Sequence, residues 1–350
     1  MNSKAYLERE NLFPAFQDQF GRIKRKLRIS VTDRCNFKCV YCMPEHPEWM
    51  KKHDLLSFEE LYSFCEFMVK HGVEQIRITG GEPLMRQGVV HFIKQLQALR
   101  AYGLQRISMT SNGHYLKQYT QALKQAGLDD LNISLDSLNP TQFEALTQKS
   151  LEPVLDGIYA AKEAGLNIKI NTVLIKGLNE DQIIPLVKWA HAQQFEPRFI
   201  EFMPLDGEQN WSADAVVTEQ EILDVLKTEY SVQVLQGHGA APARSYMVNG
   251  MPIGIISTIS NSFCGTCDRL RLNAQGEFFN CLFSTQGIPL KALIQAQMNS
   301  ANSQNSVLKE FLSPYIWHKE QGFHAIQEKQ NSTLNSKPNK RKISMYMIGG

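Results

Sequence analysis

The stretch Asp33-Arg-Cys-Asn-Phe-Lys-Cys-Val-Tyr-Cys-Met-Pro44 contains three cysteines, Cys35, Cys39 and Cys42, in the spacing C-x3-C-x2-C. Three thiolates can hold three irons of a [4Fe-4S] cluster, and the absent fourth ligand leaves one iron open to a small molecule. A disulfide or a structural zinc site is the alternative, but structural zinc takes four ligands. The spacing therefore favours a reactive iron–sulfur site.

A second set of cysteines, Cys264, Cys267 and Cys281, has the spacing C-x2-C-x13-C, with Asp268-Arg-Leu-Arg271 directly after Cys267. Taken alone, this set also fits half a zinc ribbon that a distant residue such as His238 completes. Beside the first triad, a second iron–sulfur site is the better interpretation.

The seventh cysteine, Cys65, stands apart from both triads. It falls on the apolar face of a helix expected over residues 57–69, which opens with a capping box at Ser57 and Glu60. We therefore expect Cys65 to be a core residue.

Length and composition describe a globular protein without a strong field of either sign. The 350 residues are 43% hydrophobic, enough for one large α/β domain or one domain with an appendage, and the formal net charge is +2. The run Arg22-Ile-Lys-Arg-Lys-Leu-Arg28 is basic only locally, so no nucleic-acid partner is expected. No membrane partner is expected either, because no window approaches 18 apolar residues and the first ten residues lack an apolar targeting core. Clustered cysteines suit a reducing compartment, and we expect a cytoplasmic protein.

Six short β-rich runs alternate with helical patterns, which predicts βαβ units, a parallel sheet and a barrel or most of one. Polar or glycine-rich residues follow several of these runs, where the active face of a barrel lies. The expected strands are Leu27–Val31, Ile76–Thr79, Arg106–Thr110, Leu131–Leu135, Ile168–Leu174 and Pro197–Phe202.

The pattern changes beyond about Asp214, so we expect a barrel part over residues 1–214 and a C-terminal region over 215–350. That region should hold a helix near Glu219–Leu226, β structure within Tyr246–Ile256 and a helix near Leu290–Gln297. Two polar stretches, about 299–306 and 327–341, lack apolar periodicity and are expected to be mobile. Order is expected to return in the tail that ends in Gly349-Gly350.

The first triad resembles the signature of the radical S-adenosylmethionine (SAM) enzymes. Gly80-Gly-Glu-Pro83 after a strand resembles their second motif, although such a turn alone could simply open a helix. The resemblance implies an incomplete (βα)6 TIM-type barrel with a C-terminal region that carries a second Fe-S cluster. It implies two [4Fe-4S] clusters and SAM as cofactors, the first cluster cleaving SAM to a 5′-deoxyadenosyl radical.

A closer resemblance, to the branch of this family that acts on GTP, covers nearly the whole chain. It is carried by Leu27–Cys35, Ile76–Pro83, Cys264–Arg271 and the terminal Gly349-Gly350. It implies that a hydrogen leaves C3′ of GTP and that C3′ then bonds to C8, giving (8S)-3′,8-cyclo-7,8-dihydroguanosine 5′-triphosphate for molybdenum cofactor biosynthesis. The implied partners are GTP, a reductant protein of the flavodoxin or ferredoxin type and a downstream cyclic pyranopterin monophosphate synthase, and a homodimer is compatible with it.

The site residues follow from the same resemblance. No G-x-x-x-x-G-K-[ST] motif is present, so other cations must neutralise a triphosphate. Each of these residues alone would pass as a surface, packing or loop residue. The expected GTP contacts are Arg28, Arg77, Thr110, Lys169, Arg269, Leu270 and Arg271; the SAM contacts are Tyr41, Gly81, Ser134 and Met203; and Arg269, Arg271, Gly349 and Gly350 are expected to serve catalysis.

The sequence departs from the family resemblance at two places, and two alternative functions remain open. Gln75 stands where many relatives carry Lys, and the region 299–341 is longer and more polar than the resemblance implies. One rival is another radical SAM enzyme with an auxiliary cluster, such as a peptide-modifying maturase. The other is a non-enzymatic iron–sulfur or zinc scaffold. Arg269-Leu-Arg271 and the terminal glycines favour action on GTP.

Overall fold

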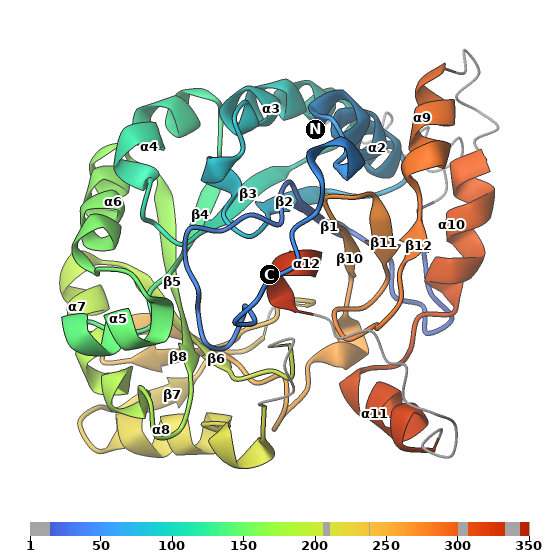
Figure 1. Ribbon diagram of the computed structural model, residues 1–350. Coiled ribbons are helices and arrows are strands. Elements are labelled where there is room, and N and C mark those ends of the chain that lie inside the picture. The colour runs from blue at the N-terminus through green and yellow to red at the C-terminus, as the bar shows by residue number, and fades with distance from the viewer. Residues whose placement is uncertain (1–14, 206–210, 238, 300–306, 333–343, 350) are drawn as a thin grey trace.

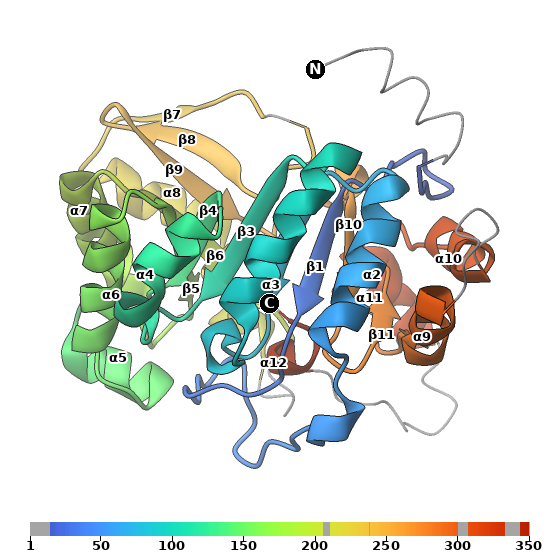
Figure 2. The same ribbon diagram turned by 90° about the horizontal axis from the view of Figure 1, so that it is seen from above.

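A half-open barrel of parallel strands forms the centre of the molecule. The computed structural model describes residues 15–205, 211–237, 239–299, 307–332 and 344–349. Strands β1 to β6 pair in chain order, each parallel to the next, and curve around a central space (Figures 1 and 2). The six predicted strands are therefore confirmed: β1 (Lys26–Ser30), β2 (Gln75–Thr79), β3 (Arg106–Ser111), β4 (Asp130–Ser134), β5 (Asn167–Leu174) and β6 (Glu196–Glu201).

Helices connect these strands and cover the outside of the barrel (Figure 1). Helix α2 begins with the predicted capping box, since the Ser57 hydroxyl accepts from the Glu60 N–H and the Glu60 carboxylate accepts from the Ser57 N–H. Cys65 is fully buried on the inner face of α2, as predicted. The outer helices are α2 (Phe58–Lys70), α3 (Val89–Leu96), α4 (Leu116–Gln125), α5 (Pro140–Thr147), α6 (Glu152–Glu163) and α7 (Ile183–Gln193).

The C-terminal region extends the sheet at both of its edges. Strand β9 (Met251–Ile256) pairs in parallel with β6, and β10 (Arg269–Leu272) pairs in parallel with β1. Strands β8 (Arg244–Val248) and β7 (Val232–Val234) follow outside β9, while β11 (Glu277–Phe279) and β12 (Ile288–Pro289) follow outside β10. Within the described residues the two edge strands, β12 and β7, do not pair with each other, so the barrel is incomplete, as predicted.

The predicted β passage in this region is a hairpin. Strands β8 and β9 pair antiparallel around Asn249 and Gly250, whose φ angles are 47° and 81°. A two-residue hairpin turn of type I′ needs positive φ at both positions, and Asn-Gly is the pair that adopts it most readily.

Helix α8 (Glu219–Lys227) packs beside α7 and β7, at the β7 edge of the sheet. Helices α9 (Lys291–Asn299), which packs beside α2, and α10 (Val307–Trp317) lie on the side of β12 (Figure 1). They are followed by α11 (Phe323–Ser332) and by the short α12 (Met345–Ile348) at the mouth of the barrel. The first residues of the second polar stretch, 327–332, are helical and complete α11. Gln, Glu and Lys in this segment are good helix formers. The remainder of that stretch, 333–341, lies outside the described residues, as do 300–306 of the other.

Gly157 of α6 supports the packing of α6 against the loop after β3. A Cβ at Gly157 would lie 2.3 Å from the Gly113 carbonyl oxygen and 3.0 Å from the Leu116 Cβ. Gly157→Ala should therefore destabilise the fold by about 1–3 kcal/mol through overpacking, although Ala is the better helix former. Chemical denaturation checks this, with Gly237→Ala as control because nothing lies within 4 Å of its Cβ position. Equal stability of the two variants would contradict the packing argument.

Candidate active site

One cavity runs through the barrel and joins the two cysteine triads. The first triad follows the carboxyl end of β1, whereas Cys264 and Cys267 precede the amino end of β10, which is parallel to β1. The triads therefore lie toward opposite ends of the same pair of strands, and a five-residue strand spans roughly 17 Å. Predicted site residues that line the cavity are Arg28, Cys35, Cys39, Tyr41, Cys42, Arg77, Gly81, Thr110, Ser134, Met203, Cys264, Cys267, Arg269, Arg271 and Cys281.

Gly80 and Gly81 support the loop that carries the first triad. The Gly81 N–H donates to the Thr32 carbonyl at 2.7 Å, and the Glu82 N–H donates to the Arg34 carbonyl at 2.8 Å. A Cβ at Gly81 would lie 2.4 Å from the Arg34 carbonyl oxygen. Only glycine permits this approach, so the motif shapes the path into Cys35.

The buried carboxylate of Glu82 connects its own loop to the end of β3 through hydrogen bonds. Its carboxylate accepts from the Leu84 N–H at 3.0 Å, the Ser111 hydroxyl at 3.0 Å and the Asn112 N–H at 2.7 Å. Burial raises the pKa of Glu82 to about 7, although these hydrogen bonds oppose the rise. Glu82 also caps the short 3-10 helix Pro83–Met85. The alternative interpretation of this motif, a turn that opens a helix, is therefore correct in part.

The three thiols of the first triad are held in one loop by backbone contacts. The Cys42 N–H donates to the Cys39 carbonyl at 3.0 Å. Burial raises the pKa of Cys35 to about 11 and that of Cys42 to about 12. His46, four residues after Cys42, is exposed and does not line the cavity.

This donor set fits an iron–sulfur cluster with one open iron. Three thiols face a cavity that has room and polar groups beside them, as a cluster with a bound small molecule requires. Within the described part of the chain, no three Cys, His, Asp or Glu side chains converge as a single metal ion would need. A cubane cluster binds each thiolate at a separate iron.

Two cations lie near the second triad, and a glycine packs directly against one of its cysteines. Burial alone would raise the pKa of Cys267, but Lys319 and Arg269 outweigh it and lower this pKa to about 6. A Cβ at Gly322 would lie 2.5 Å from the Cys264 Cβ, so the segment before α11 packs directly on this cysteine. His238, the possible fourth zinc ligand, lies outside the described residues.

Arginines from three neighbouring strands form a row across the cavity wall. Arg28 of β1 is in register with Arg77 of β2 on one side and with Arg271 of β10 on the other. Burial lowers the pKa of Arg77 and of Arg271 to about 10, and the charges of neighbouring arginines add to the effect. Like charges held this close favour an anionic ligand, which would relieve their repulsion.

Two of the expected GTP contacts, Leu270 and Lys169, do not line the cavity. Leu270 is fully buried in the hydrophobic core, because alternate residues of β10 face opposite ways and Arg269 and Arg271 take the cavity side. Lys169 pairs with Glu196 at 3.0 Å and is not among the residues that line the cavity. Arg198 of β6 lines it instead. Sequence reasoning missed Arg198, although it stands at an inward position of a predicted strand.

The expected SAM contacts gather at the carboxyl ends of the strands. The Tyr41 hydroxyl donates to the Asp136 carboxylate at 2.6 Å, and burial raises the pKa of Asp136 to about 6 against the effect of this bond. Ser134 ends β4 and Met203 follows β6, and both line the cavity near this end. Thr110 lies toward the end of β3 and also lines the cavity.

The tail enters the barrel mouth, and α12 lies at its centre (Figure 1). Gly349 has a φ of 75°, and its carbonyl accepts from the Arg271 guanidinium. The Tyr346 backbone opposes the rise that burial causes in the pKa of the Cys42 thiol, and the Tyr346 ring packs edge-on against Trp49 at 5.6 Å. The tail therefore contacts both the first triad and the arginine row. Gly350 lies outside the described residues.

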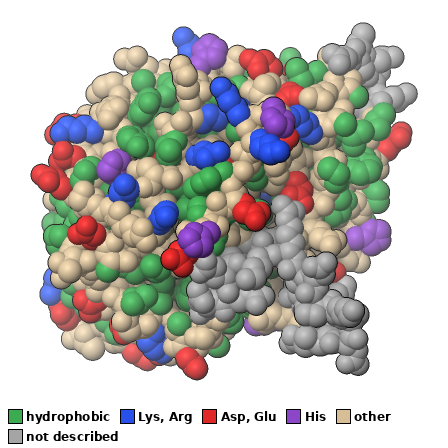
Figure 3. All heavy atoms as spheres, viewed as in Figure 1, with side chains coloured by type: hydrophobic (Ala, Val, Ile, Leu, Met, Phe, Trp, Pro, Cys, Tyr) green, Lys and Arg blue, Asp and Glu red, His purple; other side chains and the backbone are tan. Residues whose placement is uncertain are grey.

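The outer surface shows no comparable charge separation on the face seen in Figure 3. Lys and Arg side chains are interspersed there with Asp and Glu. No helix of the described residues is long and apolar enough to cross a membrane.

Comparison with known proteins defines the class. Residues 29–190 match the Radical SAM superfamily, and residues 195–325 match Molybdenum Cofactor Synthesis C. The structure of Streptococcus suis SuiB bound to S-adenosylmethionine shares the fold, with a TM-score of 0.60 and 13% identity over 85% of this chain and 69% of that chain. Together with the three-cysteine loop, these matches define a radical SAM enzyme.

Curated relatives narrow this class. GTP 3′,8-cyclase of Streptomyces coelicolor is 42% identical over 287 residues, which cover 80% of this chain and 84% of the relative. GTP 3′,8-cyclase of Staphylococcus haemolyticus is 35% identical over 345 residues, which cover 95% and 98%. The chain belongs to the GTP 3′,8-cyclase family.

The fit of the tail can be tested at Gly349. A Cβ there would lie 2.4 Å from the Thr79 Oγ1 and 2.9 Å from the Ser30 Cβ, at a φ that side chains rarely adopt. Gly349→Ala should therefore displace the tail and speed amide hydrogen exchange in residues 345–349 at least tenfold, while exchange in β1 and β2 is unchanged. Wild-type protection of the tail in this variant would contradict the close fit.

Proposed function

We propose that this protein is a GTP 3′,8-cyclase of the lyase type, which converts GTP to (8S)-3′,8-cyclo-7,8-dihydroguanosine 5′-triphosphate in the first step of molybdenum cofactor biosynthesis. The observation that carries the proposal is the single cavity in which both cysteine triads and the arginine row meet. Membership of the family supplies the substrate. The cavity supports it, because a polyanion matches the row of buried cations.

The first triad would hold the cluster that uses SAM. Cys35, Cys39 and Cys42 would be its ligands, and Tyr41, Gly81, Ser134 and Met203 would contact SAM. When bound and reduced, the cluster and SAM supply a 5′-deoxyadenosyl radical. The chain's own part is placement: the tail and the strand ends close the mouth, which excludes water and competing hydrogen donors.

The arginines would bind the triphosphate. Arg28, Arg77 and Arg271 present guanidinium groups from adjacent strands, and such groups match phosphate oxygens in pairs. Arg198 of β6 also lines the cavity, and it would bind phosphate while its Nε donates to the Glu196 carboxylate at 2.7 Å. Lys169, now paired with Glu196, could reach phosphate only by leaving that carboxylate, and Leu270 could contribute only its backbone.

The second triad would hold a second [4Fe-4S] cluster close to the guanine. Cys264, Cys267 and Cys281 line the same cavity, and Arg269 lies beside Cys267. Arg271 and Gly349 would act together on the reacting nucleotide, because they are hydrogen-bonded. Further partners in the proposal are a reductant protein of the flavodoxin or ferredoxin type and the downstream synthase, with a cytoplasmic location.

A peptide-modifying enzyme is the rival with a structural argument. SuiB bound to precursor peptide SuiA has a TM-score of 0.61 to this chain, but the identity is 13%, which shows the fold alone. The buried arginine row favours a triphosphate over a peptide. The scaffold without activity is disfavoured by the family.

The function is tested by anaerobic incubation with SAM, a reductant and GTP, followed by mass analysis of the products. We expect the cyclised nucleotide and 5′-deoxyadenosine from the wild type. Cys39→Ala should abolish both products, whereas Cys65→Ala, which removes a core thiol outside the triads, should keep them. Wild-type turnover by Cys39→Ala would defeat the assignment of the first cluster.

The two cavity-lining arginines of β10, Arg269 and Arg271, give a prediction about substrate binding. Loss of a charge-assisted contact costs about 1.5–3 kcal/mol, so Arg269→Ala and Arg271→Ala should each weaken GTP binding roughly ten- to hundredfold. Leu270→Val between them is the control, since its side chain packs in the core. Calorimetry with cluster-loaded protein measures the effect. Unchanged GTP affinity in both arginine variants would remove them from the substrate site.

A further inference from the structure

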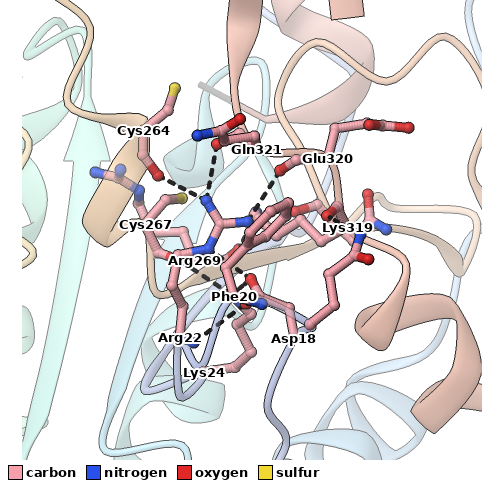
Figure 4. Close-up of polar contacts among 12 residues, drawn as sticks. Asp18, Phe20, Arg22, Lys24, Cys264, Cys267, Arg269, Lys319, Glu320 and Gln321 are labelled. Carbon is pink, nitrogen blue, oxygen red and sulfur yellow. Dashed lines mark hydrogen bonds and ion pairs between the residues drawn. The ribbon is translucent and has the colours of Figure 1, made fainter. Parts of the chain in front are cut away.

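A buried group of charged side chains lies beside the second triad (Figure 4). It consists of Asp18, Arg22 and Lys24, from the segment before β1, and Lys319, from the segment between α10 and α11. Asp18 and Lys24 are 0% exposed, Lys319 is 2% exposed and Arg22 is 8% exposed. Charged side chains are almost never buried this fully unless each is paired. The hydrogen-bond partners of these four side chains therefore indicate which parts of the structure they stabilise.

Asp18 organises two of the cations. Its Oδ2 accepts from the Arg22 Nε at 2.6 Å and from the Lys24 Nζ at 2.5 Å. Its Oδ1 accepts from the backbone N–H groups of Phe20 and Arg22 at 3.0 and 3.1 Å. One carboxylate thus fixes the loop and balances one charge. Three cations and one anion leave the network with a net positive charge.

The cations then donate to the backbone of the triad itself. Arg22 Nη1 donates to the Cys264 carbonyl at 2.7 Å, and Lys24 Nζ donates to the Cys267 carbonyl at 3.0 Å. Lys319 Nζ donates to the carbonyl of Asn280, the residue before Cys281. Every cysteine of this triad therefore has a carbonyl, its own or its neighbour's, bound by a buried cation.

The same network joins three segments that are distant in sequence. Arg22 also donates to the carbonyls of Gln321 at 2.8 Å and Glu320 at 2.9 Å, and Lys319 also donates to the Arg269 carbonyl at 3.2 Å. Because the segment after Lys319 packs on Cys264, a shift of any one segment would move the thiols.

We propose that Asp18, Arg22, Lys24 and Lys319 are positioning residues for the second [4Fe-4S] cluster and that their net positive charge makes this cluster easier to reduce. The inference rests on the proposed second cluster. Positive charge buried near a cluster stabilises the added electron, because the interior screens the interaction poorly. Hydrogen bonds and charge near the sulfurs are among the features that set cluster potentials.

The test measures the one-electron reduction of the second cluster with dithionite as donor. The titration, followed by electron paramagnetic resonance, is run in a Cys35→Ala, Cys39→Ala, Cys42→Ala background, so that the signal comes from the second triad alone. Lys24→Met and Lys319→Met remove a charge each and keep the length of the side chain. Lys24→Arg and Lys319→Arg keep the charge. Arg25→Gln is the matched control, since it removes a basic side chain of the same segment that pairs with Glu74.

Each Met variant should lower the equilibrium constant for reduction at least tenfold, a shift of 59 mV for one electron, while the Arg variants and Arg25→Gln stay near the reference. Loss of iron in the Met variants, with iron retained in the Arg variants, also supports positioning by the buried charge. An unchanged potential in both loaded Met variants overturns the inference, as does equal loss of iron from the Met and Arg variants. No iron in the reference background would instead overturn the proposed second cluster.

Discussion

The parallel pairing of β10 with β1 is the contact on which the arrangement of the site depends. Its register sets Arg271 beside Arg28 and extends the row that Arg77 begins on the other side of β1. It also fixes where the two triads lie, because one follows the end of β1 and the other precedes the start of β10. A slip of one residue would turn the arginines toward the core and Leu270 toward the cavity.

Buried cations are concentrated in two places although the chain is nearly neutral. The formal net charge of +2 describes the whole molecule, but buried Arg and Lys side chains gather inside the barrel and beside the second triad. The basic run Arg22–Arg28 shows this most clearly. Arg22, Lys24 and Arg28 turn inward. The other two cations of the run are ion-paired, Arg25 with Glu74 and Lys26 with Asp268.

Local patterns predicted the strands well, because strand and helix alternate with distinct periods. The spacing of the first cysteine triad indicated the radical SAM class that the family comparison shows. The partners of each charged residue could not be predicted in this way. From the sequence alone, Lys24 is indistinguishable from a surface lysine. In the fold it is bound by Asp18, which is close in sequence, and by the carbonyl of Cys267, which lies 243 residues further along the chain. Lys169 and Arg198 both stand on predicted strands and both pair with Glu196, yet only Arg198 lines the cavity. The pairing of β9 with β6 is likewise non-local, so no periodic pattern in the sequence indicates it.

The β1–β10 pairing has a further consequence during synthesis. Strand β1 leaves the ribosome about 240 residues before its partner, and at roughly 5–20 residues per second the wait is on the order of 10–50 s. In the last part of that wait, once β6 is complete, one edge of β1 has unpaired backbone groups beside a mostly formed sheet, and such an edge can pair with other chains. The nascent protein is thus most exposed to aggregation between completion of the sixth strand and arrival of β10, which makes this interval the one in which a chaperone would matter most.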